Sequence, residues 1–380
     1  MRIAVVRQRY NPYGGAERFV ARALAALEKQ GAEVTLVARA WQDGGAARTL
    51  KVDPFYVGRL WRDRGFARAA CAQLATAGFD LVQSHERIAC CDVYRAGDGV
   101  HRQWLANRAR AAGALARLAD TLSPYHRYVL DAEAALFASP RLQAVICNSR
   151  MVRDEIRQWF GLPAEKLHVV YNGVDLDAFV PELREAHRAR LRAALGVPEA
   201  ATVFLHVGSG FARKGVGTAI AALAQLADRD ARLFVVGADR AAGALRAAAA
   251  RAGVAARVHF AGGQADVRPW YGAADCFVLA TLYDPFPNAA LEALASGLPA
   301  IVTRQCGAAE LVQEGVTGHV VDALDADALA RAMDDLAARL GGGRRDDLRE
   351  DARASVTHLG LDAMGERLIA LYHAVLEGKT

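Results

Sequence analysis

The sequence predicts an α/β protein with two Rossmann-like domains, each built on a parallel sheet. Short apolar runs alternate with segments of helical period nearly from end to end, which is typical of parallel strands flanked by helices. The chain has 380 residues, of which 53% are hydrophobic, so it is too long for one ordinary core and long enough for two. The alternation restarts after the turn-rich segment 172–182, where we place the linker.

Ten apolar runs are predicted as strands. They are residues 2–6, 33–38, 81–85, 144–149, 167–172, 202–208, 232–237, 257–262, 276–280 and 300–303. Helices are predicted between them, for example over 16–29 and 184–195. The amphipathic segment 362–378 is predicted as a helix that crosses back to the first domain. The predicted domains are therefore 1–178 together with that helix, and 179–361.

Neither a signal peptide nor a membrane-spanning segment is expected. No run of about eighteen apolar residues lacks a charge, and Arg7 interrupts the first apolar run, so we expect a cytoplasmic protein. Charge is uneven. Residues 1–180 hold 25 Lys and Arg against 18 Asp and Glu, or +7, and the rest holds 22 against 24, or −2. The first half is expected to face something anionic.

The six cysteines form no CxxC pair and have no histidine nearby at metal-ligand spacing. Several of them lie in apolar runs, so we expect them to be reduced and mostly buried. A reactive role for the adjacent residues Cys90 and Cys91 is the less favoured alternative in a cytosolic chain.

Ligands of doubly wound sheets bind beyond the carboxyl ends of the strands, so chemistry is expected in the loops that follow strands. In the first of these loops, Gly14 and Gly15 stand between a strand and a helix, where they let the backbone approach a phosphate. A plain tight turn is an equally good interpretation of this pair by itself.

The loop after the first strand of the second domain carries the clearest phosphate signal. Gly208 and Gly210 follow the strand, and Arg213 and Lys214 stand side by side before Gly215, which opens a helix. Two cations at a helix N-terminus suit a diphosphate, so both are candidate catalytic residues that stabilise a leaving group. A solvated basic turn is the less favoured alternative. Neither a P-loop nor a GxGxxG follows a strand, which argues against a kinase and a dehydrogenase.

The third loop joins a strand to a helix through a proline-containing segment. Asp284 lies in the loop and Glu292 lies one turn into the helix, for which Asn288 is the predicted cap. Both carboxylates are expected to face one cleft and to accept hydrogen bonds from sugar and ribose hydroxyls. A chance pair of acids is the alternative.

The fourth loop lies in the first domain and contains Asp92, Asp98 and His101. Asp98 stands between two glycines, where the chain can bring a carboxylate into a cleft. A turn-forming residue and a catalytic base are equally good interpretations of Asp98.

Taken together, these loops resemble the retaining GT-B glycosyltransferases of family 4, also called glycosyl transferases group 1. The resemblance covers nearly the whole chain and is carried by GGAER, VICNSRMVRDEI with VVYNGVD, VGSGFARKG, LFVVG, and DPFPNAALEALASGLPAIVT with CGAAELV. It implies two Rossmann-like domains whose sheets face each other across a cleft, the first binding the acceptor and the second a nucleotide sugar.

The resemblance also implies roles for single residues. Gly15 contacts the donor phosphate, Gly208 lines the same site, Arg213 and Lys214 hold the diphosphate, and Glu292 binds the ribose.

The first member of the acidic pair departs from the family pattern. The family usually has two glutamates, and this chain has Asp284 at the first position, shorter by one methylene. Its contact with the 3- and 4-hydroxyls of the donor sugar is then direct, or is made by the backbone N–H groups of Phe286 and Asn288.

Within the family, DVYRAGDGVHRQW and VGSGFARKGV are most similar to lipopolysaccharide core α-1,3-glucosyltransferases, which add glucose from UDP-glucose to an inner-core heptose. Asp98 matches their candidate catalytic aspartate. The resemblance implies a UDP-sugar donor, a lipid-linked glycan acceptor, and neither cofactor nor metal, because the cations take the metal's place. No nucleic-acid partner is expected. Mannose or N-acetylglucosamine transfer, a UDP-sugar 2-epimerase and a non-catalytic glycan-binding protein are the alternatives.

The segment 101–128 alternates arginines with apolar residues. Trp104 and several leucines lie among the arginines, and Asp120 is the only acid. A basic helix with an aromatic anchor can lie on an anionic bilayer, so we expect a peripheral protein on the inner face of the cytoplasmic membrane. A helix that is solvated, or that docks on its own domain, is the alternative.

Overall fold

The structure is a computed structural model, and it describes residues 2–8, 31–40, 48–342 and 345–378. The chain divides into two compact units: unit 1 is Met1–Gly173 with Leu361–Thr380, and unit 2 is Val174–Gly360. The first crossing therefore lies at 173–174, slightly before the predicted 178–179. Gly15 and the predicted helix that follows it lie outside the described residues.

Unit 1 is built on a seven-stranded parallel sheet of order β3-β2-β1-β4-β5-β6-β7. Its strands are β1 (Arg2–Val6), β2 (Glu33–Ala38), β3 (Arg48–Lys51), β4 (Leu81–Ser84), β5 (Val93–Arg95), β6 (Ala144–Cys147) and β7 (Leu167–Val169). The sequence prediction missed β13 (Gly318–Val321) of unit 2, and in unit 1 it missed β3 and β5. Strand β3 is an edge strand with mostly exposed side chains, and β5 is only three residues long, so neither has a long apolar run.

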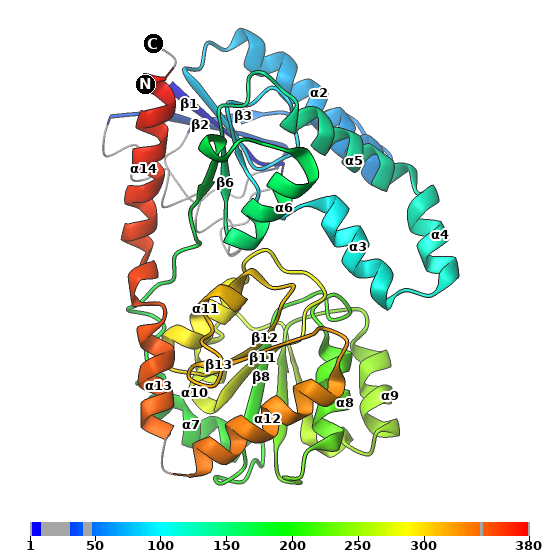
Figure 1. Cartoon of the computed structure of the whole chain (residues 1–380), viewed down its shortest axis with the longest axis vertical. Helices are drawn as coiled ribbons and strands as arrows, with labels where there is room; N and C mark the ends of the chain where they lie inside the picture. The colour runs from blue at the N-terminus through cyan, green and yellow to red at the C-terminus, as the bar shows by residue number, and fades with distance from the viewer. Residues whose placement is uncertain (1, 9–30, 41–47, 343–344, 379–380) are drawn as a thin grey trace. The chain divides into compact units, whose positions relative to one another are not determined.

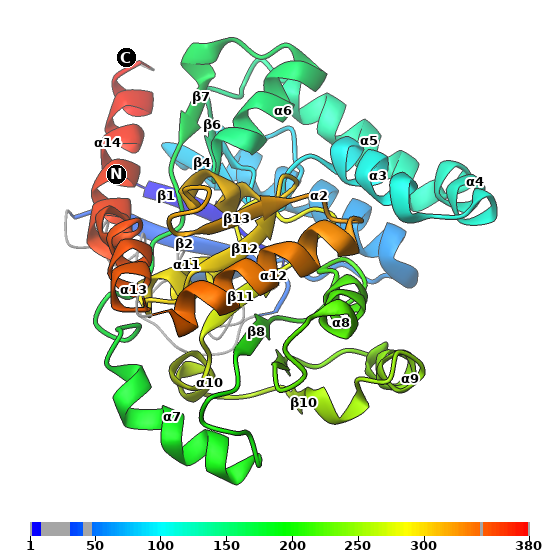
Figure 2. The same ribbon diagram turned by 60° about the horizontal axis from the view of Figure 1, so that its bottom comes forward.

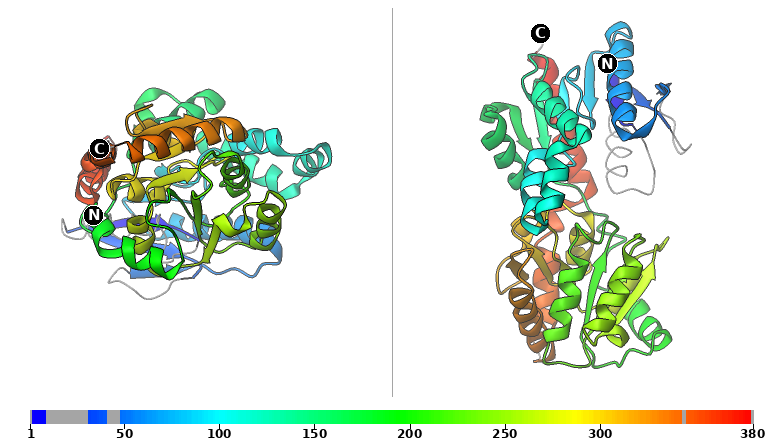
Figure 3. Two further views of the ribbon diagram at one scale, coloured as in Figure 1. Left: turned by 90° about the horizontal axis from the view of Figure 1, so that it is seen from below. Right: turned by 90° about the vertical axis from the view of Figure 1, so that its right-hand side faces the viewer.

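Helices cover both faces of this sheet. They are α14 (Leu361–Glu377) on one face, and α2 (Gly58–Thr76), α5 (Pro124–Phe137) and α6 (Arg150–Phe160) on the other (Figure 1). Neighbouring residues of β1 show the alternation, because Ile3 packs on the α14 side and Ala4 on the opposite side. Figure 3 gives two further views of the chain, in which α14 is the red helix next to the C-terminus. The packing of α14 confirms that the C-terminal helix crosses back to the first domain.

Unit 2 is built on a six-stranded parallel sheet of order β10-β9-β8-β11-β12-β13. Its strands are β8 (Val203–Val207), β9 (Arg232–Val236), β10 (Val258–Gly262), β11 (Cys276–Leu279), β12 (Ala300–Thr303) and β13 (Gly318–Val321). The two units confirm the predicted α/β class with two parallel sheets.

The helices of unit 2 also form two groups (Figure 2). One group packs in the core on one face of the sheet and consists of α8 (Val216–Gln225), α9 (Ala242–Arg251) and α12 (Ala326–Gly341). The remaining helices are α7 (Leu183–Ala194), which packs on α10 (Arg268–Ala273), and α13 (Arg345–Ala354), which packs on α11 (Asn288–Ala295).

Each sheet has one topological switch point. The strand order reverses between β8 and β11 in unit 2 and between β1 and β4 in unit 1. Loops on the two sides of a switch point leave the sheet in opposite directions and open a crevice at the carboxyl ends of the strands. The loops 208–215 and 280–287 therefore leave the sheet at the switch point of unit 2.

A buried ion cluster fastens α7 to the sheet of unit 2. Asp275, the residue immediately before β11, contacts Arg184 at 3.2 Å, Arg188 at 2.7 Å and Arg192 at 2.6 Å. Burial raises the pKa of Asp275, but attraction to Arg192 and Arg188 outweighs it, so the pKa lies below its usual value. The carboxylate therefore stays charged and offsets part of the positive charge of the three guanidinium groups.

Replacing Asp275 by asparagine is expected to destabilise the chain by about 3–5 kcal/mol, because it leaves buried guanidinium groups without a counter-charge. Urea unfolding measures this loss. Glu199→Gln is the matched control, since Glu199 contacts Arg188 from a mostly exposed position and should cost about 1 kcal/mol or less. Because the folded pKa is lowered, the contribution of Asp275 is present above its unfolded pKa of about 4 and is lost as the pH falls below it. Equal losses for the two variants would contradict this role.

The expectation that every cysteine is reduced is wrong for one pair. Cys71 on α2 and Cys90 in the loop after β4 form a disulfide, with 5.8 Å between their Cα atoms. The disulfide joins residues that lie 19 positions apart in sequence, so no local sequence motif predicts it. Cys91, next to this pair, is free and buried, and burial raises its pKa to about 12, which makes it unreactive.

The remaining free cysteines, Cys147, Cys276 and Cys306, are buried as expected. Among the helices in the described ranges, none is long and apolar enough to cross a bilayer.

Candidate functional site

The loop after β8 packs closely against its neighbours. Gly215 has a φ of +72°, and a Cβ there would lie 1.8 Å from the carbonyl oxygen of Ala280. Gly237 has a φ of +145°, and a Cβ there would lie 2.4 Å from the carbonyl oxygen of Gly208. Only glycine fits either position. The loop is therefore held against the ends of both neighbouring strands, β9 and β11.

Asp239, just after β9, fixes the backbone of this loop. Its carboxylate accepts hydrogen bonds from the N–H groups of Gly210 at 2.9 Å and Phe211 at 3.0 Å, and from Ala241 at 2.7 Å. These bonds, the one from Ala241 first, lower the pKa of Asp239. The sequence does not reveal this role, because Gly210 and Phe211 lie almost thirty positions before Asp239 in the chain.

The two predicted diphosphate ligands meet a carboxylate at the switch point. Arg213 and Lys214 each contact Oδ2 of Asp284 at 3.3 Å. The side chain of Arg213 is 36% exposed, whereas those of Lys214 and Asp284 are 12% and 10% exposed. Two cations against one carboxylate leave an excess of positive charge at the carboxyl end of the sheet.

Further hydrogen bonds join the loops on the two sides of the switch point. Arg213 donates through Nη1 to the carbonyl of Tyr283 at 2.7 Å. Its own carbonyl accepts from the N–H of Leu282 at 2.8 Å and from Oγ1 of Thr281 at 3.1 Å. The main chain of Arg213 is therefore fixed by the loop 281–282, and its guanidinium is held by the carbonyl of Tyr283 and the carboxylate of Asp284, which restricts the geometry with which it can meet an anion.

A buried histidine lies below the cation pair. His206 in β8 is 1% exposed, and burial followed by repulsion from Lys214 lowers its pKa to about 3. The imidazole is therefore neutral at physiological pH and adds no charge to the site. In the sequence, His206 stands out only as part of an apolar run that predicts a strand.

Helix α11 begins differently from the prediction. Asn288 is its first residue, and Pro287 occupies the N-cap position with no side-chain capping bond, so the predicted asparagine cap is wrong. Pro287 is extended, with φ −73° and ψ 121°, which is a conformation that its ring favours. The N-terminus of α11 follows the loop that carries Asp284, and its dipole adds positive potential there. A role for the backbone of Phe286 and Asn288 stays a prediction.

Glu292 lies in the second turn of α11. Glu292 is only 6% exposed, and its carboxylate accepts a hydrogen bond from the hydroxyl of Tyr271 at 2.9 Å. Tyr271, on α10, is itself buried. The tyrosine holds the carboxylate in one orientation, and a carboxylate can accept more than one hydrogen bond.

Asp98 belongs to unit 1 and lies in a tight turn. The N–H of Gly99 donates to the carbonyl of Ala96 at 3.1 Å, and Gly99 has a φ of +68°. Asp98 is exposed at this turn and lies close enough to Glu86 and Arg87 to influence their pKa values. Both interpretations of Asp98, as a turn-former and as a base, agree with this position.

The switch point of unit 1 holds a carboxylate that the sequence analysis missed. Glu86, after β4, accepts a hydrogen bond from the N–H of Gln8, after β1, at 2.9 Å. Burial raises the pKa of Glu86. A cavity of about 60 Å³ lies beside this pair, and Asp63 and Tyr125 also line it. Only the pairing of β1 with β4 brings these segments together.

The other two polar residues of the fourth predicted loop have structural partners. Asp92 accepts from the N–H of Val82 at 2.7 Å and contacts Arg141 at 3.3 Å. Nε2 of His101 contacts Nδ1 of His126 at 3.0 Å, and burial lowers the pKa of His101 to about 3.

Two family models match the chain. The model for glycosyltransferase family 4 matches residues 13–178, and the model for glycosyl transferases group 1 matches residues 201–339. One match falls in each half of the chain, and the second includes every described residue of the predicted donor site.

Similar proteins agree with these models. The lipopolysaccharide glucosyltransferase WaaG of Escherichia coli is 26% identical over 84% of this chain and 85% of its own length. A D-inositol 3-phosphate glycosyltransferase of Xylanimonas cellulosilytica is 28% identical over 94% of this chain and 91% of its own.

Solved structures share the fold. The crystal structure of WaaG matches with a TM-score of 0.81 and 23% identity, over 97% of this chain and 99% of that one. Anabaena HepE in complex with UDP-glucose matches with a TM-score of 0.72 and 21% identity, over 98% and 100%. The prediction of a GT-B fold is confirmed by these matches.

Proposed function

This chain belongs to the glycosyltransferases of family 4 and group 1, and from that premise we propose that it is a retaining enzyme that transfers glucose from UDP-glucose to a heptose of the lipopolysaccharide core. The observation that carries the proposal is the pair Arg213 and Lys214, held at the switch point of unit 2 beside Asp284. Glu292 follows on the next helix, where it suits the ribose.

The cation pair is suited to a leaving diphosphate. In glycosyl transfer the nucleoside diphosphate departs as an anion, and charge develops on its phosphate oxygens. Arg213 and Lys214, with the nearby N-termini of α8 and α11, stabilise that charge without a metal ion. A fixed guanidinium does so at little reorganisation cost, because the carbonyl of Tyr283 and the carboxylate of Asp284 already hold its position.

Two similar proteins support glucose from UDP-glucose as the proposed donor. HepE, which shares the fold, has been solved with UDP-glucose, and WaaG is named a glucosyltransferase. Glu292 is a suitable acceptor for ribose hydroxyls, and Asp284 is a suitable one for sugar hydroxyls. Because Asp284 already contacts both cations, it also orients them for the diphosphate.

The acceptor hydroxyl then attacks from the face that the diphosphate leaves. Its proton passes to the departing phosphate or to Asp98, the exposed carboxylate of the turn in unit 1. The bond from the anomeric carbon to the phosphate oxygen breaks and a bond to the acceptor oxygen forms, so the configuration is retained.

A lipid-borne acceptor places the enzyme at a membrane, and the apolar surface of unit 1 supports this. Among the described residues, the large hydrophobic side chains that are exposed in unit 1 are Phe55, Val57, Trp61, Leu115, Leu118 and Leu122. The last three recur along one side of α4 (Ala114–Leu122). This surface, with the exposed Arg117 beside it, suits the headgroup region of an anionic bilayer.

The basic segment 101–128 is divided differently from the prediction. It comprises α3 (His101–Ala111), α4 and the start of α5 instead of one helix. Arg102 of α3 lies over the ring of Trp159 on α6, so α3 docks on its own unit, and Arg108 contacts Asp120 of α4 at 2.8 Å within the segment. The exposed leucines of α4 are the better membrane anchor.

Replacing Leu118 and Leu122 together by serine is expected to weaken binding to vesicles of phosphatidylglycerol and phosphatidylethanolamine by about ten-fold, because two apolar side chains no longer enter the bilayer. Co-sedimentation measures the bound fraction. Leu324→Ser is the matched control, since Leu324 is an exposed leucine of unit 2 and its loss should leave binding unchanged. Unaltered binding of the double variant would contradict the membrane surface.

Donor and reaction type are tested with a panel of nucleotide sugars. The full chain should release UDP from UDP-glucose faster than from UDP-N-acetylglucosamine, and release no GDP from GDP-mannose, in the presence of heptose-containing core oligosaccharide. Faster release from another donor would overturn the glucose assignment. Conversion of a UDP-sugar without an acceptor would indicate a 2-epimerase instead.

A further inference from the structure

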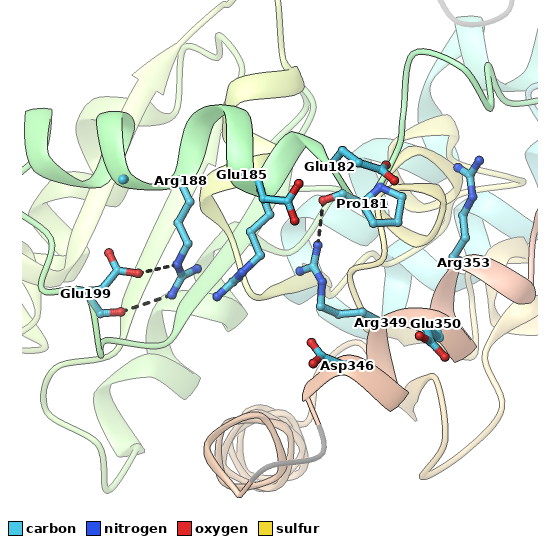
Figure 4. A pocket seen from close by; sticks show the side chains of 11 residues that line it. Pro181, Glu182, Glu185, Arg188, Glu199, Asp346, Arg349, Glu350 and Arg353 are labelled. Atoms are coloured by element: carbon cyan, nitrogen blue, oxygen red, sulfur yellow. Dashed lines mark hydrogen bonds and ion pairs between the residues drawn. The ribbon is translucent and has the colours of Figure 1, made fainter.

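Unit 2 has a second polar groove that the donor site does not use. It lies between α7 and α13, has a volume of about 550 Å³ and is shown in Figure 4. Its charges are sorted by depth. The arginines Arg184, Arg188, Arg349 and Arg353 are buried or half-buried, whereas every acid that lines it is exposed: Glu182, Glu185, Glu199, Asp346 and Glu350.

Arg349 lacks a carboxylate partner among the described residues. Its Nη2 donates to the carbonyls of Pro181 at 3.2 Å and Ser296 at 3.4 Å, while its buried Nη1 has no hydrogen-bond partner in the described part of the chain. Only 8% of the residue is exposed. A buried guanidinium nitrogen without an acceptor is costly, which makes this position attractive for an anion.

Neighbouring arginines add to the positive charge around Arg349. Asp275 is shared by Arg184, Arg188 and Arg192, so it has little capacity left for Arg349. Burial, and then repulsion from Arg184, lower the pKa of Arg349 to about 10. An anion in the groove would offset the repulsion between these guanidinium groups.

The acids at the edge of the groove decide which anion fits. A ligand that is anionic throughout would be repelled by the exposed carboxylates, for example Glu182 and Glu185. A ligand with a phosphate at one end and hydroxyls at the other would place its phosphate on the arginines and donate its hydroxyls to these carboxylates. The volume is within the range of small-molecule sites.

We propose that this groove is a binding site for a sugar phosphate. Arg349 and Arg184 hold the phosphate, and Glu182 and Glu185 accept hydrogen bonds from the sugar hydroxyls. The site is separate from the diphosphate ligands on the loop after β8.

The arginines also connect the groove to the donor helix. Arg349 donates to the carbonyl of Ser296, and Arg353 donates to that of Ala295, both at the C-terminal end of α11. Ser296 in turn donates through its hydroxyl to the carbonyl of Glu292 at 2.8 Å. A bound phosphate that draws Arg349 toward itself therefore changes the KM for UDP-glucose. This change in KM rests on the proposed function, whereas the binding of the sugar phosphate is independent of it.

Calorimetric titration of the full chain with glucose 6-phosphate, inorganic phosphate and glucose tests the site. We expect saturable binding of glucose 6-phosphate, about ten-fold weaker binding of inorganic phosphate and none of glucose. Binding should persist in the Lys214→Ala chain, because the donor site is not involved. Its loss there, or the absence of saturable binding in both chains, would overturn the proposal.

Two variants and a control locate the ligand. Arg184→Ala should weaken glucose 6-phosphate binding by about ten-fold or more, and Glu185→Ala should weaken glucose 6-phosphate without affecting inorganic phosphate. Arg190→Ala is the control, since Arg190 is an exposed arginine of α7 that does not line the groove. Thermal unfolding checks that each variant is folded. An equal effect of Arg190→Ala would exclude this groove.

The KM for UDP-glucose tests the coupling separately. Binding of glucose 6-phosphate with an unchanged KM for UDP-glucose would support the site and overturn its coupling to α11.

Discussion

Replacing Lys214 by alanine is expected to lower the turnover number by about 100- to 1000-fold, the cost of removing one preorganised charge from a developing oxyanion. Lys214 is well suited to this role, because its ammonium is mostly buried and contacts Asp284 at 3.3 Å. The loss should appear in kcat more than in KM, since the charge on the leaving phosphate grows as the glycosidic bond breaks.

Two further variants separate charge from fold. Lys51→Ala removes an exposed lysine of β3 and should leave turnover unchanged. Lys214→Arg keeps the charge but enlarges the head group below Gly208, where a Cβ would already lie 2.8 Å from the lysine nitrogen, so it should recover activity only in part. Near-normal turnover of Lys214→Ala, measured as UDP release at saturating donor, would remove Lys214 from the diphosphate site.

Replacing Glu292 by glutamine is expected to raise the KM for UDP-glucose by about 10- to 100-fold, because a charged hydrogen bond to the ribose becomes a neutral one. The turnover number should change little, since the ribose lies away from the bond that breaks. Steady-state kinetics over a range of donor concentrations measure both constants.

The tyrosine beside Glu292 provides the matched control. Tyr271→Phe keeps the ring in the core and removes only the hydroxyl that donates to Glu292 at 2.9 Å. Its KM should rise by less than about ten-fold, because the carboxylate keeps its charge but is oriented less firmly. An unchanged KM in Glu292→Gln, or a larger rise in Tyr271→Phe, would exclude the ribose role.

Where a strand end, glycines and charges follow one another in the chain, the sequence predicts well which of these residues lie together in the fold. Gly208, Arg213 and Lys214 lie on one loop, and the structure places all three at the switch point. Contacts from distant segments are different. The contacts of Asp239 and Glu86 depend on the pairing of β9 with β8 and of β4 with β1. Parallel pairing joins residues that are far apart in sequence, so the sequence alone does not predict these contacts.

Errors in the prediction also have physical causes. Asn288 has the residue type of a helix cap, but Pro287 immediately before it takes the extended conformation that starts the helix. Cys71 and Cys90 pair because α2 packs beside the loop after β4, which their spacing does not reveal. The predicted membrane surface did not include the exposed residues Phe55 and Trp61, because they lie outside the basic segment 101–128 and are not charged.

A crystal structure of the full chain with UDP-glucose tests the donor site most directly. We predict that the diphosphate oxygens lie within hydrogen-bonding distance of Arg213 and Lys214, that the ribose hydroxyls donate to Glu292, and that the sugar hydroxyls lie next to Asp284. A diphosphate bound away from both cations, or a ribose that does not contact Glu292, would contradict the assignment of the donor site.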